Sequence, residues 1–137
     1  MDMVGILIIS HYGLGESLAE CAAHIMSRPI PQLRHLAVSR QDDPDVVFAR
    51  AKSIVDDMNQ GDGVLVLTDM FGGTPSNVAN RLIIPGLIEA VAGVNLPMVV
   101  RALCYSHEPL ETVVAKAITG GLEGVLYVLP EQPAKEN

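Results

Sequence analysis

The stretch VLVLTDMFGGTPSN, residues 64–77, joins a run of apolar residues to two glycines and then to a Thr-Pro-Ser-Asn sequence. The apolar run at residues 64–67 is rich in branched side chains and is typical of a buried strand. The GGTPSN sequence is typical of a helix start, because Thr74 can act as the N-cap and Pro75 suits the first helical position. The stretch therefore predicts a buried strand followed closely by a helix.

Strand and helix patterns alternate along the rest of the chain. Further strands are predicted at residues 4–10, 33–38, 90–94 and, last, 124–129. The predicted helices are residues 14–27, the segment from the Asp43 cap to Gly61, the segment from GGTPSN to about Leu82, residues 95–105, and the segment from Pro109 to Gly120 and Gly121. The first helix has one apolar face, which is expected to pack inward and comprises Leu14, Leu18, Cys21, Ala22 and Ile25.

Continuous apolar strands that alternate with amphipathic helices are typical of a parallel sheet covered on both faces. We therefore predict an α/β fold: a doubly wound, mostly parallel open sheet with helices on both faces. The last strand, residues 124–129, is a candidate antiparallel edge strand. A single domain is expected over residues 1–129, and residues 130–137 are predicted to form a flexible C-terminal tail.

Composition restricts the classes of function. The chain has 137 residues, of which 49% are hydrophobic and 18% charged, enough for one compact core. A formal charge of -7 without a Lys/Arg cluster argues against a nucleic-acid partner. The apolar run at residues 4–9 is too short to span a bilayer and follows Asp2, so we expect a cytoplasmic protein. Cys21 and Cys104 are isolated and are predicted to be buried free thiols.

Two polar residues follow strands that we expect to be neighbours. His11 follows the first predicted strand, and Asp69 follows the third. Ligand sites in open parallel sheets gather at the carboxyl ends of the strands, where the strand order reverses. Adjacent strands lie about 4.8 Å apart, so the two side chains can meet. A carboxylate that accepts a hydrogen bond from one imidazole nitrogen directs the lone pair of the other nitrogen outward. His11 is thus predicted to be a nucleophile oriented by Asp69.

An anion site is predicted beside this histidine. Gly72 and Gly73 allow backbone amides to approach an anion closely, and a helix N-terminus favours a phosphoryl group without a basic side chain. The predicted phosphate-binding residues are Gly72, Gly73, Thr74 and Ser10. A histidine facing such a site predicts a phosphohistidine.

Other readings of these residues are weaker. No two histidines have metal-ligand spacing, so neither a metal ion nor a cofactor is predicted, and His24, His35 and His107 are expected at the surface or at helix ends. Hydrolysis by Ser10, His11 and an aspartate is disfavoured, because a GxSxG elbow is absent and neighbouring strand residues point to opposite faces. A non-catalytic module that binds a small anion or a nucleotide is the other alternative, although neither GxGxxG nor GxxxxGK[ST] occurs.

Three stretches carry a family resemblance: GILIISHYGLGESL at residues 5–18, VLVLTDMFGGTPSNVANR at 64–81, and VAGVNLPMVVRAL at 91–103. In order and spacing they resemble the mannose-class IIA component of the bacterial phosphoenolpyruvate-dependent sugar phosphotransferase system. The likeness runs from about residue 3 to residue 128.

The resemblance implies a phosphotransferase reaction with protein partners. His11 would accept a phosphoryl group from the phosphocarrier protein HPr and pass it to a histidine of a IIB component, with Asp69 orienting the imidazole. Thr74 takes the position of the family's small hydroxyl residue. The family resemblance also implies a homodimer, with the membrane components IIC and IID involved only indirectly. The chain departs from the family at Tyr12, where a glycine usually follows the histidine.

Two related roles remain open at this point. The phosphocarrier domain that feeds dihydroxyacetone phosphorylation shares the strand-end histidine, but the GGTPSN turn favours the mannose class. The other alternative is a regulatory role, in which the phosphorylation state of the protein acts as a signal. The sugar served by the pathway is not encoded here, because a IIA component handles only the phosphoryl group.

Overall fold

The computed structural model describes residues 3–131. Its four strands, β1 (Gly5–His11), β2 (Leu33–Val38), β3 (Val64–Thr68) and β4 (Ile88–Ala92), form one parallel sheet in the order β2-β1-β3-β4. The helices within these residues are α1 (Leu14–Met26), α2 (Pro44–Met58), α3 (Gly73–Leu82), α4 (Leu96–Cys104) and α5 (Leu110–Glu123).

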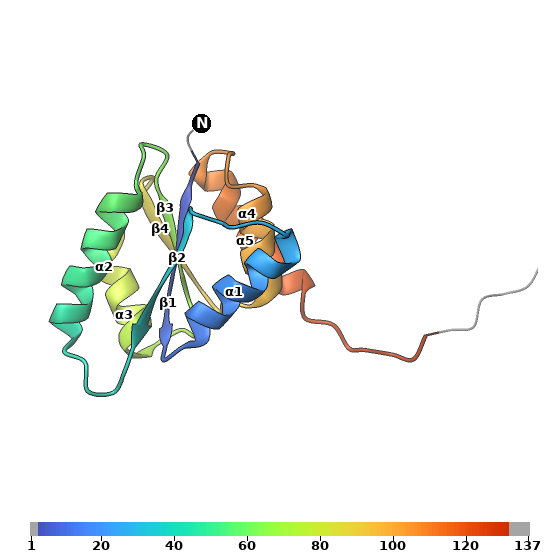
Figure 1. Ribbon diagram of the computed structural model, residues 1–137, viewed down its shortest axis with the longest axis horizontal. Helices are drawn as coiled ribbons and strands as arrows, with labels where there is room; N and C mark the ends of the chain where they lie inside the picture. The colour runs from blue at the N-terminus through green and yellow to red at the C-terminus, as the bar shows by residue number, and fades with distance from the viewer. Residues whose placement is uncertain (1–2, 132–137) are drawn as a thin grey trace, which may run out of the picture.

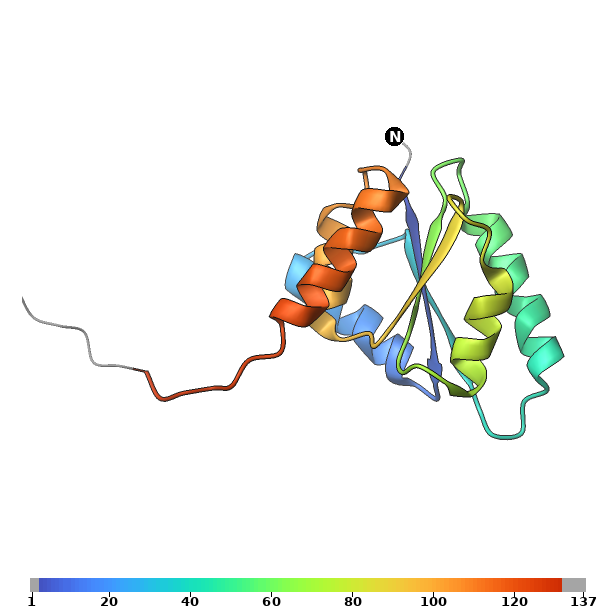
Figure 2. The same ribbon diagram turned by 180° about the vertical axis from the view of Figure 1, so that it is seen from behind.

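The helices cover both faces of the sheet. Helices α2 and α3 lie on one face, and α1, α4 and α5 lie on the other (Figures 1 and 2). This arrangement confirms the predicted doubly wound α/β fold. None of the helices within residues 3–131 has the length and apolar character needed to cross a membrane.

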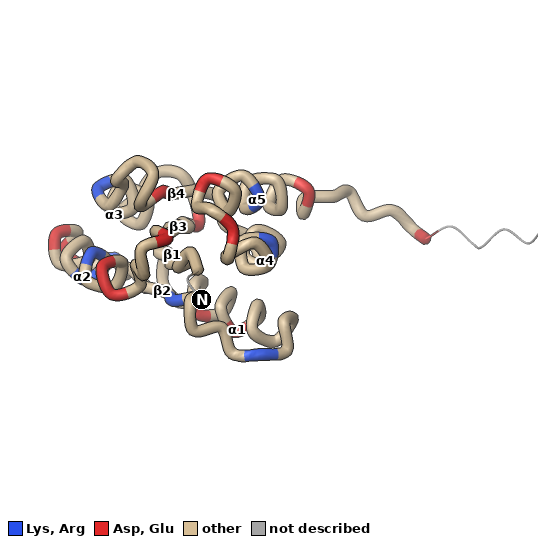
Figure 3. Tube along the Cα trace, turned by 90° about the horizontal axis from the view of Figure 1, so that it is seen from above, with Lys and Arg blue, Asp and Glu red and all other residues tan. Residues whose placement is uncertain are grey.

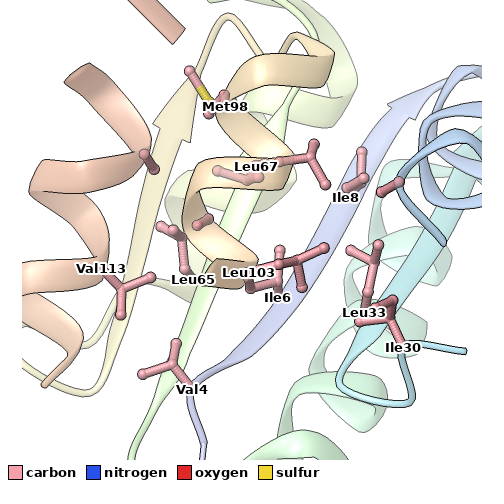
Figure 4. Close-up of a cluster of buried hydrophobic side chains, with 14 of the residues drawn as sticks. Val4, Ile6, Ile8, Ile30, Leu33, Leu65, Leu67, Met98, Leu103 and Val113 are labelled. Carbon is pink, nitrogen blue, oxygen red and sulfur yellow. The ribbon is translucent and has the colours of Figure 1, made fainter. Parts of the chain in front are cut away.

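The central strands are buried on both sides, which explains their unbroken apolar sequences. In β1, Ile6 and Ile8 pack under α1, α4 and α5, whereas Leu7 and Ile9 pack under α2 and α3. Figure 4 shows the first of these two clusters, in which Ile6, Ile8, Leu65, Leu67, Leu103 and Val113 lie together. Each face of the sheet therefore has its own hydrophobic core.

The chain forms first the neighbour of β1 on one side and then its neighbour on the other side. After β1 it forms α1 and pairs as β2 on one flank, then crosses through α2 to pair as β3 on the opposite flank. The strand order thus reverses between β1 and β3, whose last paired residues are Ile9 and Thr68. The predicted neighbourhood of these two strands is confirmed, and their carboxyl ends define the switch point of the fold.

Several predicted boundaries are confirmed. β2 spans the predicted residues, and α2 starts at Pro44 after Asp43, whose side chain accepts a hydrogen bond from the Asp45 N–H at 2.9 Å. Asn95 caps α4 by accepting from the Met98 N–H at 2.9 Å. β4 starts and ends two residues earlier than predicted, because Gly93, at φ 96°, already turns away from the strand.

The prediction of a last strand at residues 124–129 is wrong. After α5, residues 125–130 belong to no helix or strand, and their apolar side chains are exposed. Figure 2 shows this segment, in red, running away from the domain. Of the predicted flexible tail, residues 132–137 lie outside the described residues, and the domain boundary at residue 129 stays a prediction.

Gly120 and Gly121 do not end α5, which continues to Glu123. A Cβ on Gly120 would lie 2.5 Å from the Arg101 Cβ, and one on Gly121 would lie 2.7 Å from the Met98 Cε. These glycines therefore allow α5 to approach α4 closely, and the loss of helix propensity is offset by that packing.

The inward face of α1 also differs from the prediction. Gly15 and Ala22 are buried, whereas Leu14, Cys21 and Ile25 are exposed. The cause is close packing through the smallest residues: a Cβ on Gly15 would lie 3.1 Å from Ile8. Cys104 is exposed as well, so the predicted burial of both free thiols is wrong.

Charged residues are dispersed over the molecule. Figure 3 shows Lys and Arg interspersed with Asp and Glu along the helices, with acidic positions in excess. Within residues 3–131, four exposed ion pairs join residues of opposite charge, among them Arg81 with Asp45 at 3.0 Å and Arg101 with Glu123 at 3.0 Å. Such exposed pairs contribute little to stability.

Candidate phosphoryl-transfer site

His11 and Asp69 meet at the switch point of the sheet. His11 is the last residue of β1, and Asp69 directly follows β3. The His11 Nδ1 lies 2.8 Å from the Asp69 Oδ2, and the His11 backbone N–H donates to the same oxygen at 3.0 Å. The other oxygen, Oδ1, accepts from the Met70 N–H at 3.0 Å. These contacts anchor the carboxylate against the end of β1.

The electrostatic balance keeps Asp69 ionised. Burial of its side chain, which is 12% exposed, acts to raise the pKa of the carboxyl group. The hydrogen bonds from the His11 backbone and imidazole outweigh this effect, and the pKa lies below its usual value of 3.8. An ionised carboxylate only accepts hydrogen bonds, so the His11 Nδ1 carries a proton and donates it to Asp69. The lone pair of the imidazole is consequently on Nε2.

The Nε2 edge of the imidazole faces the start of α3. A Cβ placed on Gly73 would lie 3.5 Å from both the Nε2 and the Cε1 of His11. Gly72 and Gly73 have φ values of 91° and 82°, which favour glycine strongly. The side chain of His11 is 44% exposed, so Nε2 is reachable from outside the protein.

The predicted cap of α3 is wrong in detail. Gly72, and not Thr74, is the N-cap, and Pro75 is the third helical residue. The left-handed conformations of the two glycines turn the chain early enough for the helix to begin at Gly73. Within the described residues no side chain caps α3, unlike α2 and α4, which Asp43 and Asn95 cap. The first-turn amides of α3, including those of Gly73 and Thr74, are therefore available to an anion.

Ser10 is placed elsewhere. Its side chain is fully buried, and its Oγ accepts a hydrogen bond from the Gly15 N–H at 2.9 Å, in the first turn of α1. His11, the next residue along the strand, is exposed, as the alternation of strand side chains requires. The structure thus brings His11, Asp69, Gly72, Gly73 and Thr74 to one edge, and it leaves the Ser10 hydroxyl out of that group.

The remaining histidines lie outside this site. His24 is in the last turn of α1, His35 is on the edge strand β2, and His107 lies between α4 and α5. All three are exposed, as predicted. Within residues 3–131, no cluster of three or more His, Cys, Asp or Glu side chains is arranged to hold a metal ion.

Sequence reasoning missed two features of this edge. One is the role of Ser10 in the start of α1, which no capping motif signals because the serine lies five residues before its partner. The other is a set of exposed apolar side chains beside the site, Tyr12, Met70 and Phe71. The signal available for these three was their place in loops that follow strands.

Comparisons with known proteins agree with this geometry. The family model described as "PTS system fructose IIA component" matches residues 5–118. Over 66 residues the chain is 41% identical to the PTS system mannose-specific EIIAB component of Escherichia coli strain K12, a match that covers 46% of this chain and 20% of that protein. The match thus spans about a fifth of the length of the curated relatives.

Two solved structures are similar over most of their length. The mannose/sorbose-specific IIA subunit of the phosphotransferase system from Enterococcus faecalis superposes with a TM-score of 0.84 at 25% identity, covering 96% of this chain and 100% of that one. The EIIA component from Streptococcus agalactiae superposes with a TM-score of 0.80 at 25% identity, covering 91% and 97%. The predicted resemblance is confirmed, and the chain belongs to the family of PTS fructose IIA components.

Proposed function

We propose that this protein is a phosphoryl carrier whose acceptor atom is the Nε2 of His11. The observation that carries the proposal is that the ionised Asp69 holds Nδ1 while Nε2 faces the uncapped start of α3. Family membership supports phosphoryl transfer as the general chemistry. The donor is phosphorylated HPr, and the acceptor of the onward transfer is a histidine of a IIB component, as the family resemblance implies. We propose a cytoplasmic location for this reaction.

In the proposed step, the lone pair of the His11 Nε2 attacks the phosphorus of the donor phosphohistidine. A new P–N bond forms as the donor P–N bond breaks, and its electron pair returns to the donor imidazole. The His11 Nδ1 keeps its proton, so the phosphorylated ring is cationic, and the Asp69 carboxylate at 2.8 Å offsets that charge. In the onward transfer, a IIB histidine attacks the same phosphorus atom, and the P–N bond to the His11 Nε2 breaks.

The start of α3 stabilises the group that is transferred. The amides of Gly73 and Thr74, together with the positive end of the helix dipole, favour the phosphoryl oxygens. Because these donors are backbone groups in a helix, they are already oriented before the phosphoryl group arrives. The site therefore needs no basic side chain for anion binding.

A homodimer is the oligomeric state that we propose. The exposed segment at residues 125–129 is apolar, and β4 is an edge strand of the sheet, whose outer side is bridged at Ile88 by Ile84. Between β4 and α5 lies an open groove of about 530 Å³ whose lining includes Val91, Ile118 and Leu122. A second copy of the chain covers both features, because exposed apolar segments and sheet edges of this kind otherwise promote aggregation.

The test is reconstitution with phosphoenolpyruvate, enzyme I and HPr, followed by intact-mass measurement. We expect one phosphoryl group per chain on the wild type and none on His11→Ala. The label is expected to be acid-labile and base-stable, as a phosphoramidate is. Variants of His24, His35 and His107 are the controls and should be labelled like the wild type. Labelling of His11→Ala, or an acid-stable ester on Thr74, would contradict the proposal.

A further inference from the structure

Three exposed apolar residues lie in the two loops that carry the proposed acceptor histidine and its aspartate. Tyr12 directly follows His11, and Met70 and Phe71 directly follow Asp69. Their exposed fractions are 58%, 58% and 88%. Single exposed apolar residues are common, but three gathered in the two loops that carry the site form a patch of the kind that contacts a partner.

The backbone at Tyr12 is held in an unfavourable conformation. Its φ is 49°, and among residues 3–131 Ser27 is the one other non-glycine residue with a positive φ. Ser27 is the left-handed cap at the end of α1, where such a φ is ordinary. Tyr12 ends no helix and precedes the N-cap of α1. Its N–H donates to the Val38 carbonyl at 3.0 Å, which ties the strained residue to β2.

Packing inside the chain does not account for this strain. The Tyr12 side chain is more than half exposed, so it contributes little to either core. A glycine at this position would adopt the same φ without steric cost. Strained residues persist next to functional sites when the side chain serves a purpose there, and here that purpose lies outside the chain.

The surroundings of the patch are acidic. The loops at this edge of the sheet carry Asp42 and Asp43, both exposed, against the single cation Arg40, and the chain as a whole has a formal charge of -7. A partner that docks here is therefore expected to have an apolar face bordered by basic residues, since complementary charge speeds association and selects partners.

We propose that Tyr12, Met70 and Phe71 form a docking rim for the phosphoryl-donor protein and that Tyr12 is a specificity-determining residue of that rim. The occupant is a phosphohistidine carrier protein with an apolar face and a basic border. The inference rests on the proposed function, because it assumes that His11 is loaded by another protein.

The location of the rim favours this occupant over a second copy of the chain. A donor can transfer to the His11 Nε2 only if its own phosphohistidine comes within bonding distance, so its surface must cover the adjacent loops. A second copy seated on Tyr12 and Phe71 would instead close the access to His11. The apolar segment proposed for the homodimer, residues 125–129, is another part of the chain, whereas Phe71 lies beside β4 and lines a small open pocket with Val91 and Ala92.

The experiment measures the rate of phosphoryl transfer against the concentration of phosphorylated HPr. The variants are Tyr12→Gly, which relieves the backbone strain, and Phe71→Ser. The matched control is Ile84→Ser, which removes an apolar side chain that is 51% exposed at the opposite end of the sheet. We expect the KM for the donor to rise about tenfold in the first two variants, with kcat within about twofold of the wild type, and no change in the control.

A second arm uses phosphoramidate, a small phosphoryl donor that needs no protein surface. The rim variants should be labelled on His11 by phosphoramidate at the wild-type rate, which separates docking from chemistry. Thermal melting of each variant checks that the fold is intact.

Each outcome bears on one claim. A wild-type KM in both rim variants overturns the docking rim and leaves the proposed function standing, provided that the wild type is labelled on His11. Failure of both donors to label His11 in the wild type overturns the proposed function itself. Dissociation of a dimer by Phe71→Ser in light scattering shows that the rim binds a second copy, and this result also overturns the inference.

Discussion

The Nδ1 of His11, at the end of β1, lies 2.8 Å from the Oδ2 of Asp69, which follows the neighbouring parallel strand β3. The two residues are 58 positions apart in the sequence, and the strand order β2-β1-β3-β4 brings them together. The contact assigns the proton to Nδ1 and the lone pair to Nε2, which in turn faces Gly73.

Replacing the carboxylate by an amide should slow the transfer. In Asp69→Asn the amide can support the other imidazole tautomer and does not offset the charge of the phosphorylated ring, so we expect transfer about 10²-fold slower with the fold retained. Rapid-quench kinetics with phosphorylated HPr measure the rate, and circular dichroism checks the fold. A wild-type rate would mean that Asp69 does not orient the nucleophile.

Asp69 should also contribute a pH-dependent part of the stability. Its pKa is lowered on folding from the usual 3.8, so its contribution is fully present above that pH and is lost as the pH falls further, through the lowered folded value. Urea unfolding between pH 7 and pH 2 should show this loss in the wild type. The free-energy difference between wild type and Asp69→Asn should shrink below about pH 4. A difference that stays constant over the whole range would contradict the lowered pKa.

Gly73 can be tested with a control glycine that has the same φ angle. Gly73 and Gly86 both have a φ of 82°, but a Cβ on Gly86 would meet nothing within 4 Å, whereas one on Gly73 would lie 3.5 Å from the His11 Nε2. Each alanine variant should lose about 1–2 kcal/mol of stability from the left-handed backbone. Only Gly73→Ala should also lose phosphoryl transfer, because its methyl group occupies the place of the incoming group. Equal transfer rates in the two variants would remove Gly73 from the site.

The close packing of α5 on α4 predicts an unusual response to alanine. Although alanine favours helices, Gly120→Ala places a Cβ 2.5 Å from that of Arg101 and should destabilise the protein by about 1–3 kcal/mol. The exposed neighbour variant Thr119→Ala should change stability by less than about 0.5 kcal/mol. Thermal unfolding of both proteins measures the difference, and a more stable Gly120→Ala protein would contradict the packing.

The proposed homodimer depends on the apolar segment after α5. Introducing charges with Leu126→Asp and Val128→Asp should convert the dimer to a monomer, because both side chains are exposed in the single chain and would be buried only by a partner. Light scattering measures the mass, with Val46→Asp as a control that should stay dimeric, because Val46 is an exposed residue of α2, away from β4 and residues 125–129. A wild-type protein that is monomeric at micromolar concentration would rule out the homodimer.

The site residues that could be predicted from sequence are those that local sequence patterns indicate. His11 ends one strand and Asp69 directly follows another, both strands have a clear apolar pattern, and Asp43 has a side chain suited to capping. Thr74 was misassigned because sequence does not show that Gly72 and Gly73 both adopt positive φ and start the helix early.

The remaining errors concern contacts between distant segments. Residues 124–129 have the composition of a strand, but a strand needs a pairing partner, and within residues 3–131 the segment has none. Gly120 and Gly121 have the composition of a helix end, yet their role is set by the side chains of α4. Cys21 and Ile25 are exposed because Gly15 and Ala22 form the inward face of α1 instead. Which face packs inward depends on how closely α1 approaches β1 and β2.

The central claim is that the Nε2 of His11 is the phosphoryl acceptor. The most direct measurement is nitrogen-15 NMR of the protein after loading with phosphoenolpyruvate, enzyme I and HPr, with the coupling to phosphorus observed on the imidazole. We expect the phosphorus coupling on the Nε2 of His11, with a proton retained on Nδ1. Coupling on the Nδ1 of His11, or on any other histidine, would contradict the account.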